Sequence, residues 1–302
     1  MKTRMFFSLL TATVLVSFLS ISGAVGQVIY DSIPSPLPGN FPSIGFQCCG
    51  LNEVGDEVQF AGTNRSLGSV TVTLSDWACQ SGHWSGSTGP CVTTAGATFR
   101  HPITLNIYDV NFPPPSSPLA TITQDFDIPY RPSQSTNCPD RQWYDSSSGR
   151  CYYGLAFNIT FDNLSVDVPD KIIFGVTYNT SKSGYNPLGV PGHYDDLQVA
   201  LRDYTQFGPI AVGTDLDDNA MFLSCTRAFY TCKPNVSVPL HHETGSYPYT
   251  PAIRFTSAVP VPKTKDIIKD DCKEGGWRNL SRTDGTPFKN QGDCIQYVNT
   301  GK

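Results

Sequence analysis

The sequence predicts an all-β protein, an antiparallel jelly-roll-like β-sandwich with a small disulfide-closed C-terminal tail module. Three observations lead to this class. Apolar and polar residues alternate with a period of two in many short runs, which places the apolar side chains on one face of a strand. Glycine and proline make up 50 of the 302 residues, above the usual ~12%. The main part of the chain shows no apolar stripe with a helical period.

Eight to ten strands are expected in the main part of the chain, with turns rich in Gly, Pro and Ser between them. An antiparallel sandwich of jelly-roll or related Greek-key topology accommodates this number of short strands. The apolar runs that predict strands are residues 58–60, 70–74, 103–107, 120–128, 155–161, 172–178, 197–201 and 253–255.

Residues 1–26 have the three parts of a secretory signal peptide. Lys2 and Arg4 precede an apolar stretch over residues 5–21, and small residues end at Gly26. We expect cleavage after Gly26 and a mature protein without a transmembrane anchor. An uncleaved anchor is the alternative, but about 17 apolar residues are short for a membrane span.

Charge divides the rest of the chain into two unlike parts. Residues 27–262 carry a formal charge of −9, whereas residues 263–302 carry +2 and are much richer in charged side chains. A Val-Pro-Val-Pro segment lies at the step and is typical of an extended linker. We therefore predict a sandwich domain over 27–258, a linker over 259–265 and a tail module over 266–302. The acidic balance argues against nucleic acid as a partner.

The tail module is expected to contain two short elements. The first is a helix over Asp266–Cys272, followed by a Gly-Gly turn and Trp277, and the second covers Asn290–Val298. About 40 residues bury too little surface to fold securely alone. A disulfide that closes the module would add about 3 kcal/mol.

Ten cysteines in an exported chain are best interpreted as disulfides. Proximity in the sequence predicts four pairs, which are Cys79 with Cys91, Cys138 with Cys151, Cys225 with Cys232, and Cys272 with Cys294. Cys48 and Cys49 are left over, and a vicinal bridge, a bond to another chain and reduced thiols all stay open for them. A zinc site is disfavoured, because no CxxC pair occurs.

Two of the predicted disulfide loops enclose a tryptophan among polar residues. These are Trp84 and Trp143, with Tyr144 beside the second. Flat aromatic faces on stapled loops suit the C–H faces of sugar rings, so the three residues are candidates for glycan binding. The alternative is that each tryptophan folds inward as the hydrophobic anchor of its loop.

Asp215, Asp217 and Asn219 occupy alternate positions, as the oxygen ligands of a calcium loop do. The glycine and the closing glutamate of such loops are missing, so a solvated turn is the main alternative. No other cofactor is expected. His241 and His242 are adjacent, and adjacent side chains in an extended segment point to opposite sides, so they are poorly placed to share one metal ion.

The sequence contains no GxSxG, HExxH, Walker or GxGxxG motif, so no catalytic residue is assigned. Six Asn-x-Ser/Thr sequons would carry glycans if the source were a eukaryote. The acceptor residues are Asn64, Asn158, Asn163, Asn179, Asn235 and Asn279.

The main part of the chain resembles a functionally uncharacterised family of secreted, mostly bacterial proteins. The resemblance rests on several segments in order, among them YDSIPSPLPGNFPSIGF (30–46), SVTVTLSDWACQSG (69–82), TFRHPITLNIYDV (98–110) and KIIFGVTYNTS (171–181). The tail, with DDCKEGGWRN and PFKNQGDCIQYV, is similar to a cysteine-bearing piece found at the end of many secreted bacterial proteins. This resemblance implies an extracellular β-sandwich and no established catalytic residues.

These observations favour a secreted, non-catalytic protein of the cell envelope or matrix. Its role would be structural or adhesive, with an extracellular glycan or an envelope component as partner. The alternative function is that of a hydrolase that acts on extracellular polysaccharide with two carboxylates in a groove.

Overall fold

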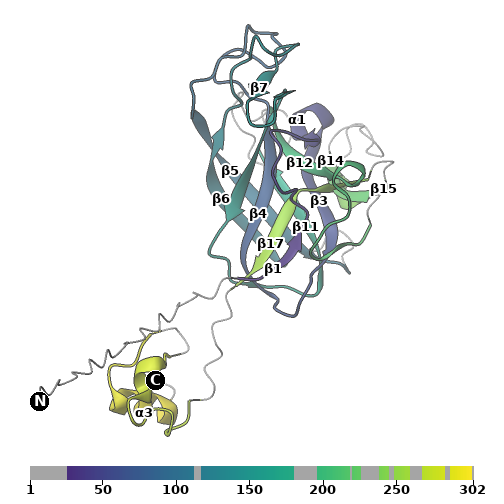
Figure 1. Ribbon diagram of the computed structural model, residues 1–302. Coiled ribbons are helices and arrows are strands. Elements are labelled where there is room, and N and C mark those ends of the chain that lie inside the picture. Colours follow the sequence, from purple (N-terminus) through teal and green to yellow (C-terminus); the bar gives the residue numbers. More distant parts are fainter. Residues whose placement is uncertain are drawn as a thin grey trace, which may run out of the picture.

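The structure is a computed structural model of the whole chain, and Figure 1 shows the course of its ribbon. The predicted linker and nearly all of the predicted signal peptide lie outside the described residues, and so does Cys232 of one predicted disulfide. The described residues are 26–111, 117–179, 196–217, 220–225, 238–244, 248–258, 267–282 and 286–300.

Strands make up most of the described structure, and the helices are short. The elements in chain order are β1 (Val28–Asp31), β2 (Ser43–Gly45), α1 (Phe46–Cys49), β3 (Leu51–Gln59), β4 (Ser66–Asp76), β5 (Thr98–Asp109), β6 (Ala120–Pro129), β7 (Trp143–Asp145), β8 (Arg150–Tyr152), β9 (Leu155–Phe161), β10 (Val166–Asp167), β11 (Lys171–Tyr178), β12 (Leu197–Asp203), α2 (Tyr204–Phe207), β13 (Thr214–Asp215), β14 (Ala220–Cys225), β15 (Val238–Thr244), β16 (Tyr249–Pro251), β17 (Ile253–Ser257), η2 (Gly276–Asn279) and α3 (Gln291–Thr300).

The strands form two large antiparallel sheets and one small hairpin. The first sheet has the order β1-β17-β4-β12-β16, and β2, β9 and β10 pair with members of this series. The second has the order β15-β14-β3-β11-β5-β6, with β13 beside β3. The hairpin β7-β8 lies at one end of the molecule (Figure 1). The predicted all-β class with antiparallel sheets is therefore confirmed.

The two sheets share one hydrophobic core. Val70, Val72 and Leu74 of β4 are fully buried in it, as the period-two pattern predicts. Aromatic contacts join the sheets, because the Phe174 and Phe255 rings have centroids 5.7 Å apart. Complete burial of a large apolar side chain stabilises a fold by about 1.5–3 kcal/mol.

The C-terminal residues have a small hydrophobic cluster of their own, which contains Phe288 and the Cys272–Cys294 disulfide. Of the two predicted elements, the second corresponds to α3. The prediction of a helix over Asp266–Cys272 is wrong for the described residues, because residues 269–275 form turns. Side-chain hydrogen bonds compete with the helix here, since a carboxylate oxygen of Asp271 accepts the Ile268 amide at 3.1 Å.

Three of the four predicted disulfides are present among the described residues, with Cα separations of 5.4 Å for Cys79–Cys91, 5.7 Å for Cys138–Cys151 and 5.8 Å for Cys272–Cys294. Cys49 is also disulfide-bonded. None of the described helices has the length and apolar character needed to cross a membrane.

Candidate functional site

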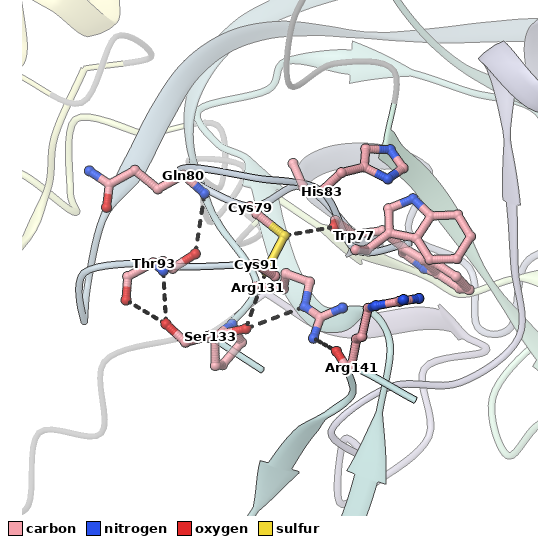
Figure 2. Close-up of a disulfide and its surroundings, with 12 residues drawn as sticks. Trp77, Cys79, Gln80, His83, Cys91, Thr93, Arg131, Ser133 and Arg141 are labelled. Atoms are coloured by element: carbon pink, nitrogen blue, oxygen red, sulfur yellow. Dashed lines mark hydrogen bonds between the residues drawn. A yellow bond between two sulfur atoms is a disulfide. The ribbon is translucent and has the colours of Figure 1, made fainter. Parts of the chain in front are cut away.

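The loop closed by Cys79 and Cys91 begins directly after β4 and is fixed at several points. Ser81 and Val92 exchange two backbone hydrogen bonds of 2.9 Å inside it. The Thr93 amide donates to the Ser133 hydroxyl at 2.8 Å, which ties the loop to the segment after β6. Figure 2 shows the contact between Thr93 and Ser133, with Thr93 on one side of the disulfide and Trp77 on the other. The loop is therefore a rigid support for the side chains that it carries.

The second stapled loop, Cys138–Cys151, leads into the β7-β8 hairpin. Its tryptophan, Trp143, is only 7% exposed, and the indole N–H donates to the Gly154 carbonyl at 2.7 Å. Trp143 thus occupies the anchor position that was the alternative to glycan binding. Tyr144 is 41% exposed on the same hairpin.

Three aromatic side chains gather where these loops meet the end of β4, and we call them the aromatic cluster: Trp77, Trp84 and Tyr153. The Trp77 and Tyr153 rings are stacked, with centroids 5.7 Å apart and an interplanar angle of 11°. Trp84 stands edge-on to Trp77, at 4.9 Å and 86°. All three side chains are partly exposed. The cluster therefore offers aromatic surface to solvent in a fixed arrangement.

Polar groups border the aromatic cluster. The Trp84 indole N–H donates to Asp196 Oδ1 at 3.0 Å, and His83 Nε2 lies 3.6 Å from Asp196 Oδ2. A backbone contact adds to this, because the Trp77 amide donates to the Asp196 carbonyl at 3.1 Å. Acceptors and a titratable ring thus lie beside the aromatic faces.

Beneath the cluster lie two fully buried charged residues, Asp76 and Arg131. Burial raises the pKa of Asp76 well above its usual value, and the charge of nearby Asp196 adds to this. Burial also lowers the pKa of Arg131 to about 10. Arg131 Nη2 donates to the Arg141 carbonyl at 2.8 Å (Figure 2). Asp76 Oδ2 and Arg131 Nη1 have no hydrogen-bond partner in the structure.

Gly154 allows the packing around the aromatic cluster. A Cβ on this residue would lie 2.5 Å from Trp77 Nε1 and 2.6 Å from the Ser75 hydroxyl. The β4-β9 register places Asp76 opposite Leu155, so Trp77 and Gly154 come together across neighbouring strands. No sequence motif marks Trp77 as a candidate, although this tryptophan directly precedes the Cys79 loop.

The predicted calcium ligands lie in a turn after β13. Asp215 Oδ1 accepts the Asp217 amide at 3.0 Å, which is a common turn geometry, and Asp217 Oδ2 lies 3.0 Å from His242 Nε2. Asn219 falls outside the described residues. Within the described ranges no group of three or more His, Cys, Asp or Glu side chains is placed to hold a metal ion.

The sequon asparagines differ in their surroundings. Asn158, Asn163 and Asn279 are exposed. The Asn64 side-chain amide donates to the Ala258 carbonyl at 3.1 Å, which occupies the nitrogen that would carry a glycan. Asn179 is partly buried, and Asn235 lies outside the described residues.

Comparisons with known proteins add no relative. A scan against family models, a search of curated proteins and a search of solved structures each found no match. The family resemblance given above therefore stays a prediction.

Proposed function

We propose that this protein is a secreted, non-catalytic, jelly-roll-like β-sandwich that binds carbohydrate through the aromatic cluster of Trp77, Trp84 and Tyr153. The observation that carries the proposal is the cluster itself, partly exposed and braced by a stapled loop. Disulfides support an extracellular location, because such bonds persist in oxidising compartments. Strands that alternate between the two sheets, as β3, β4 and β5 do, support the jelly-roll topology.

The chemistry of the cluster suits a sugar ring. The C–H face of a sugar packs against a partly exposed aromatic ring, and its hydroxyls need donors and acceptors at the edge of that ring. Asp196 and His83 provide such groups beside Trp84. Because the loop is already closed by a disulfide, little conformational entropy is lost on binding. Binding without chemistry would serve the structural or adhesive role that we propose in an envelope or matrix.

The proposal is tested on a glycan array with the mature chain and the variant Trp84→Ala. We expect the wild type to bind a defined set of glycans and Trp84→Ala to lose about two- to tenfold in affinity, the loss expected for a stacking aromatic ring. Trp277→Ala removes a tryptophan from the C-terminal module and is the matched control, which should bind as the wild type does.

Two outcomes would contradict the proposal. One is a wild-type chain, shown by circular dichroism to be folded, that binds no glycan on the array. The other is equal binding by the wild type and Trp84→Ala. Trp84→Phe keeps a flat ring without the indole N–H, and it should retain part of the affinity. This variant separates the loss of stacking from a disturbance of the loop.

The alternative of polysaccharide hydrolysis meets a structural difficulty. Asp56 and Asp215 are close enough to perturb each other, as a catalytic pair would be. Asp56 is only 1% exposed, however, so its carboxyl group cannot touch a polymer substrate in this conformation. We therefore retain binding as the proposal.

A further inference from the structure

A second candidate site lies beside α2 and β13, formed by residues other than those of the aromatic cluster. It is a pocket of about 390 Å³. Its lining combines apolar side chains with one carboxylate. The residues that line it are Tyr204, Pro209, Ile210, Gly213, Thr214 and Asp215.

The Asp215 carboxylate is one of two on the same face of the second sheet. Asp215 pairs with Val58 across β13 and β3, so both side chains point to the same side, and Val58 is fully buried in the core. Asp56 lies two residues from Val58 on β3 and thus shares that face. Diagonal neighbours of this kind are about 7–8 Å apart. The two carboxyl groups therefore interact, and Asp56 forms the buried side of the site.

Buried hydroxyl groups complete the inner wall. Gly213 has a φ of +79°, and a Cβ there would lie 2.6 Å from Tyr30 Cδ2, so the Tyr30 ring lies directly under the floor of the pocket. Tyr30 and Thr250 are both fully buried and close to Asp56. The Tyr30 hydroxyl, Asp56 Oδ2 and Thr250 Oγ1 make no hydrogen bond of ordinary geometry, although Thr250 lies close enough to Tyr30 and Asp56 to lower the pKa of both. The lining residues separate these three groups from the pocket, so they form a polar layer behind its inner wall.

The charges around Asp56 are negative. Burial raises the pKa of Asp56, and the carboxylates of Asp215 and Asp217 raise it further. Among the described groups that set this pKa, the Thr250 side chain and the Glu57 amide lower it, and neither of them carries a positive charge. A cation in the pocket would therefore be attracted by the Asp215 carboxylate and would favour the ionised form of Asp56.

Two basic side chains of the neighbouring strands, Arg202 and His242, already have partners. Arg202 of β12 directs its guanidinium to backbone carbonyls, among them those of Phe207 at 2.7 Å and Pro209 at 3.1 Å. His242 contacts Asp217 at 3.0 Å. The Tyr204 hydroxyl donates to Asp215 Oδ2 at 2.5 Å, which holds that carboxylate in place at the pocket wall.

We propose that this pocket binds an alkylammonium group, an apolar stem with a cationic head, as in a lysine side chain or a free primary amine. The stem lies against Pro209 and Ile210, and the head meets Asp215 with the field of Asp56 behind it. The ring of Tyr204 adds an aromatic surface that favours a cation. Because the cation favours the ionised form of Asp56, whose pKa burial raises, binding releases a proton, and affinity rises with pH.

The experiment is calorimetric titration of the mature chain with Nα-acetyl-lysine methylamide and with n-butylamine, which separates a lysine side chain from a free amine. The Nε-acetylated lysine derivative is the neutral control ligand. We expect Asp215→Asn to weaken binding about tenfold to hundredfold, the usual loss for a hydrogen bond to a charged group. Asp162→Asn removes the same charge at an exposed position and should bind as the wild type does.

A second variant tests the proposal independently, in case Asp215→Asn does not fold. Tyr204→Phe keeps both carboxylates but removes the hydroxyl that positions Asp215, and it should weaken binding about two- to tenfold. Titrations in two buffers with different ionisation enthalpies should show proton release. The proposal would be overturned if the neutral ligand bound as tightly as the amines, or if Asp215→Asn and Asp162→Asn had equal affinity. It would also be overturned if the wild type bound calcium but not the amines, or bound none of these ligands. Trp84→Ala should leave amine binding unchanged.

Discussion

Removal of the disulfide that braces the aromatic cluster should cost more stability than removal of its neighbour. Cys79 and Cys91 are separated by 12 residues, and Cys138 and Cys151 by 13. Loops of these lengths give nearly the same loss of chain entropy, about 3 kcal/mol each. The first pair is more deeply buried, at 6% and 0% exposed. Replacement of both of its cysteines by alanine therefore also leaves a cavity, which adds about 1 kcal/mol or more.

The measurement is urea unfolding of the two double alanine variants and the wild type, followed by far-ultraviolet circular dichroism. We expect the free energy of unfolding to fall by about 4 kcal/mol for Cys79→Ala with Cys91→Ala and by about 3 kcal/mol for Cys138→Ala with Cys151→Ala. The reasoning is refuted if the second variant is the less stable one. A loss below about 1 kcal/mol in either variant would also contradict the chain-entropy argument.

Two further predictions concern a buried acid and the tail. Asp56→Asn should remove a pH dependence of stability. Burial raises the pKa of Asp56, so the folded state holds a proton that the unfolded state releases above about pH 4. The free energy of unfolding of the wild type therefore falls by up to about 1.4 kcal/mol per pH unit as the pH rises toward the folded pKa. Thermal unfolding across this range checks it, and parallel curves for the two proteins would count against it. In the tail, the double variant Cys272→Ala with Cys294→Ala should make residues 267–300 sensitive to trypsin. The unfolding midpoint of the sandwich should stay unchanged, because the tail has its own core. A fall of that midpoint in the variant would contradict this prediction.

Much of the sandwich could be predicted from the sequence, because half-buried strands show their period directly. The run 155–161 coincides with β9, and the run 120–128 lies within β6. Several strands that the sequence did not reveal are two to four residues long, such as β10 and β13. Such strands are too short for an alternation to appear, and their pairing depends on partners far away in the chain.

The candidate site was only partly predictable. Closely spaced cysteines indicated the stapled loop, and Trp84 stood out within it. The contribution of Trp77 and Tyr153 depends on the register of β4 against β9, in which Asp76 lies opposite Leu155. No local pattern encodes that register. The inward position of Trp143 follows from its hydrogen bond to Gly154, which also requires the folded neighbour strand.

The buried acids did leave a signal in the sequence. Asp76 continues the series Val70, Val72 and Leu74 in phase, so a strand that buries those residues must also bury the carboxyl group. Asp56 stands in the same relation to Val58, two residues before it on the core side of β3. Burial of a carboxyl group is expensive unless it is neutralised or paired. A charged residue in phase with buried apolar neighbours is therefore a better indication of a site than a surface cluster of acids, and here it marks both regions for which binding is proposed.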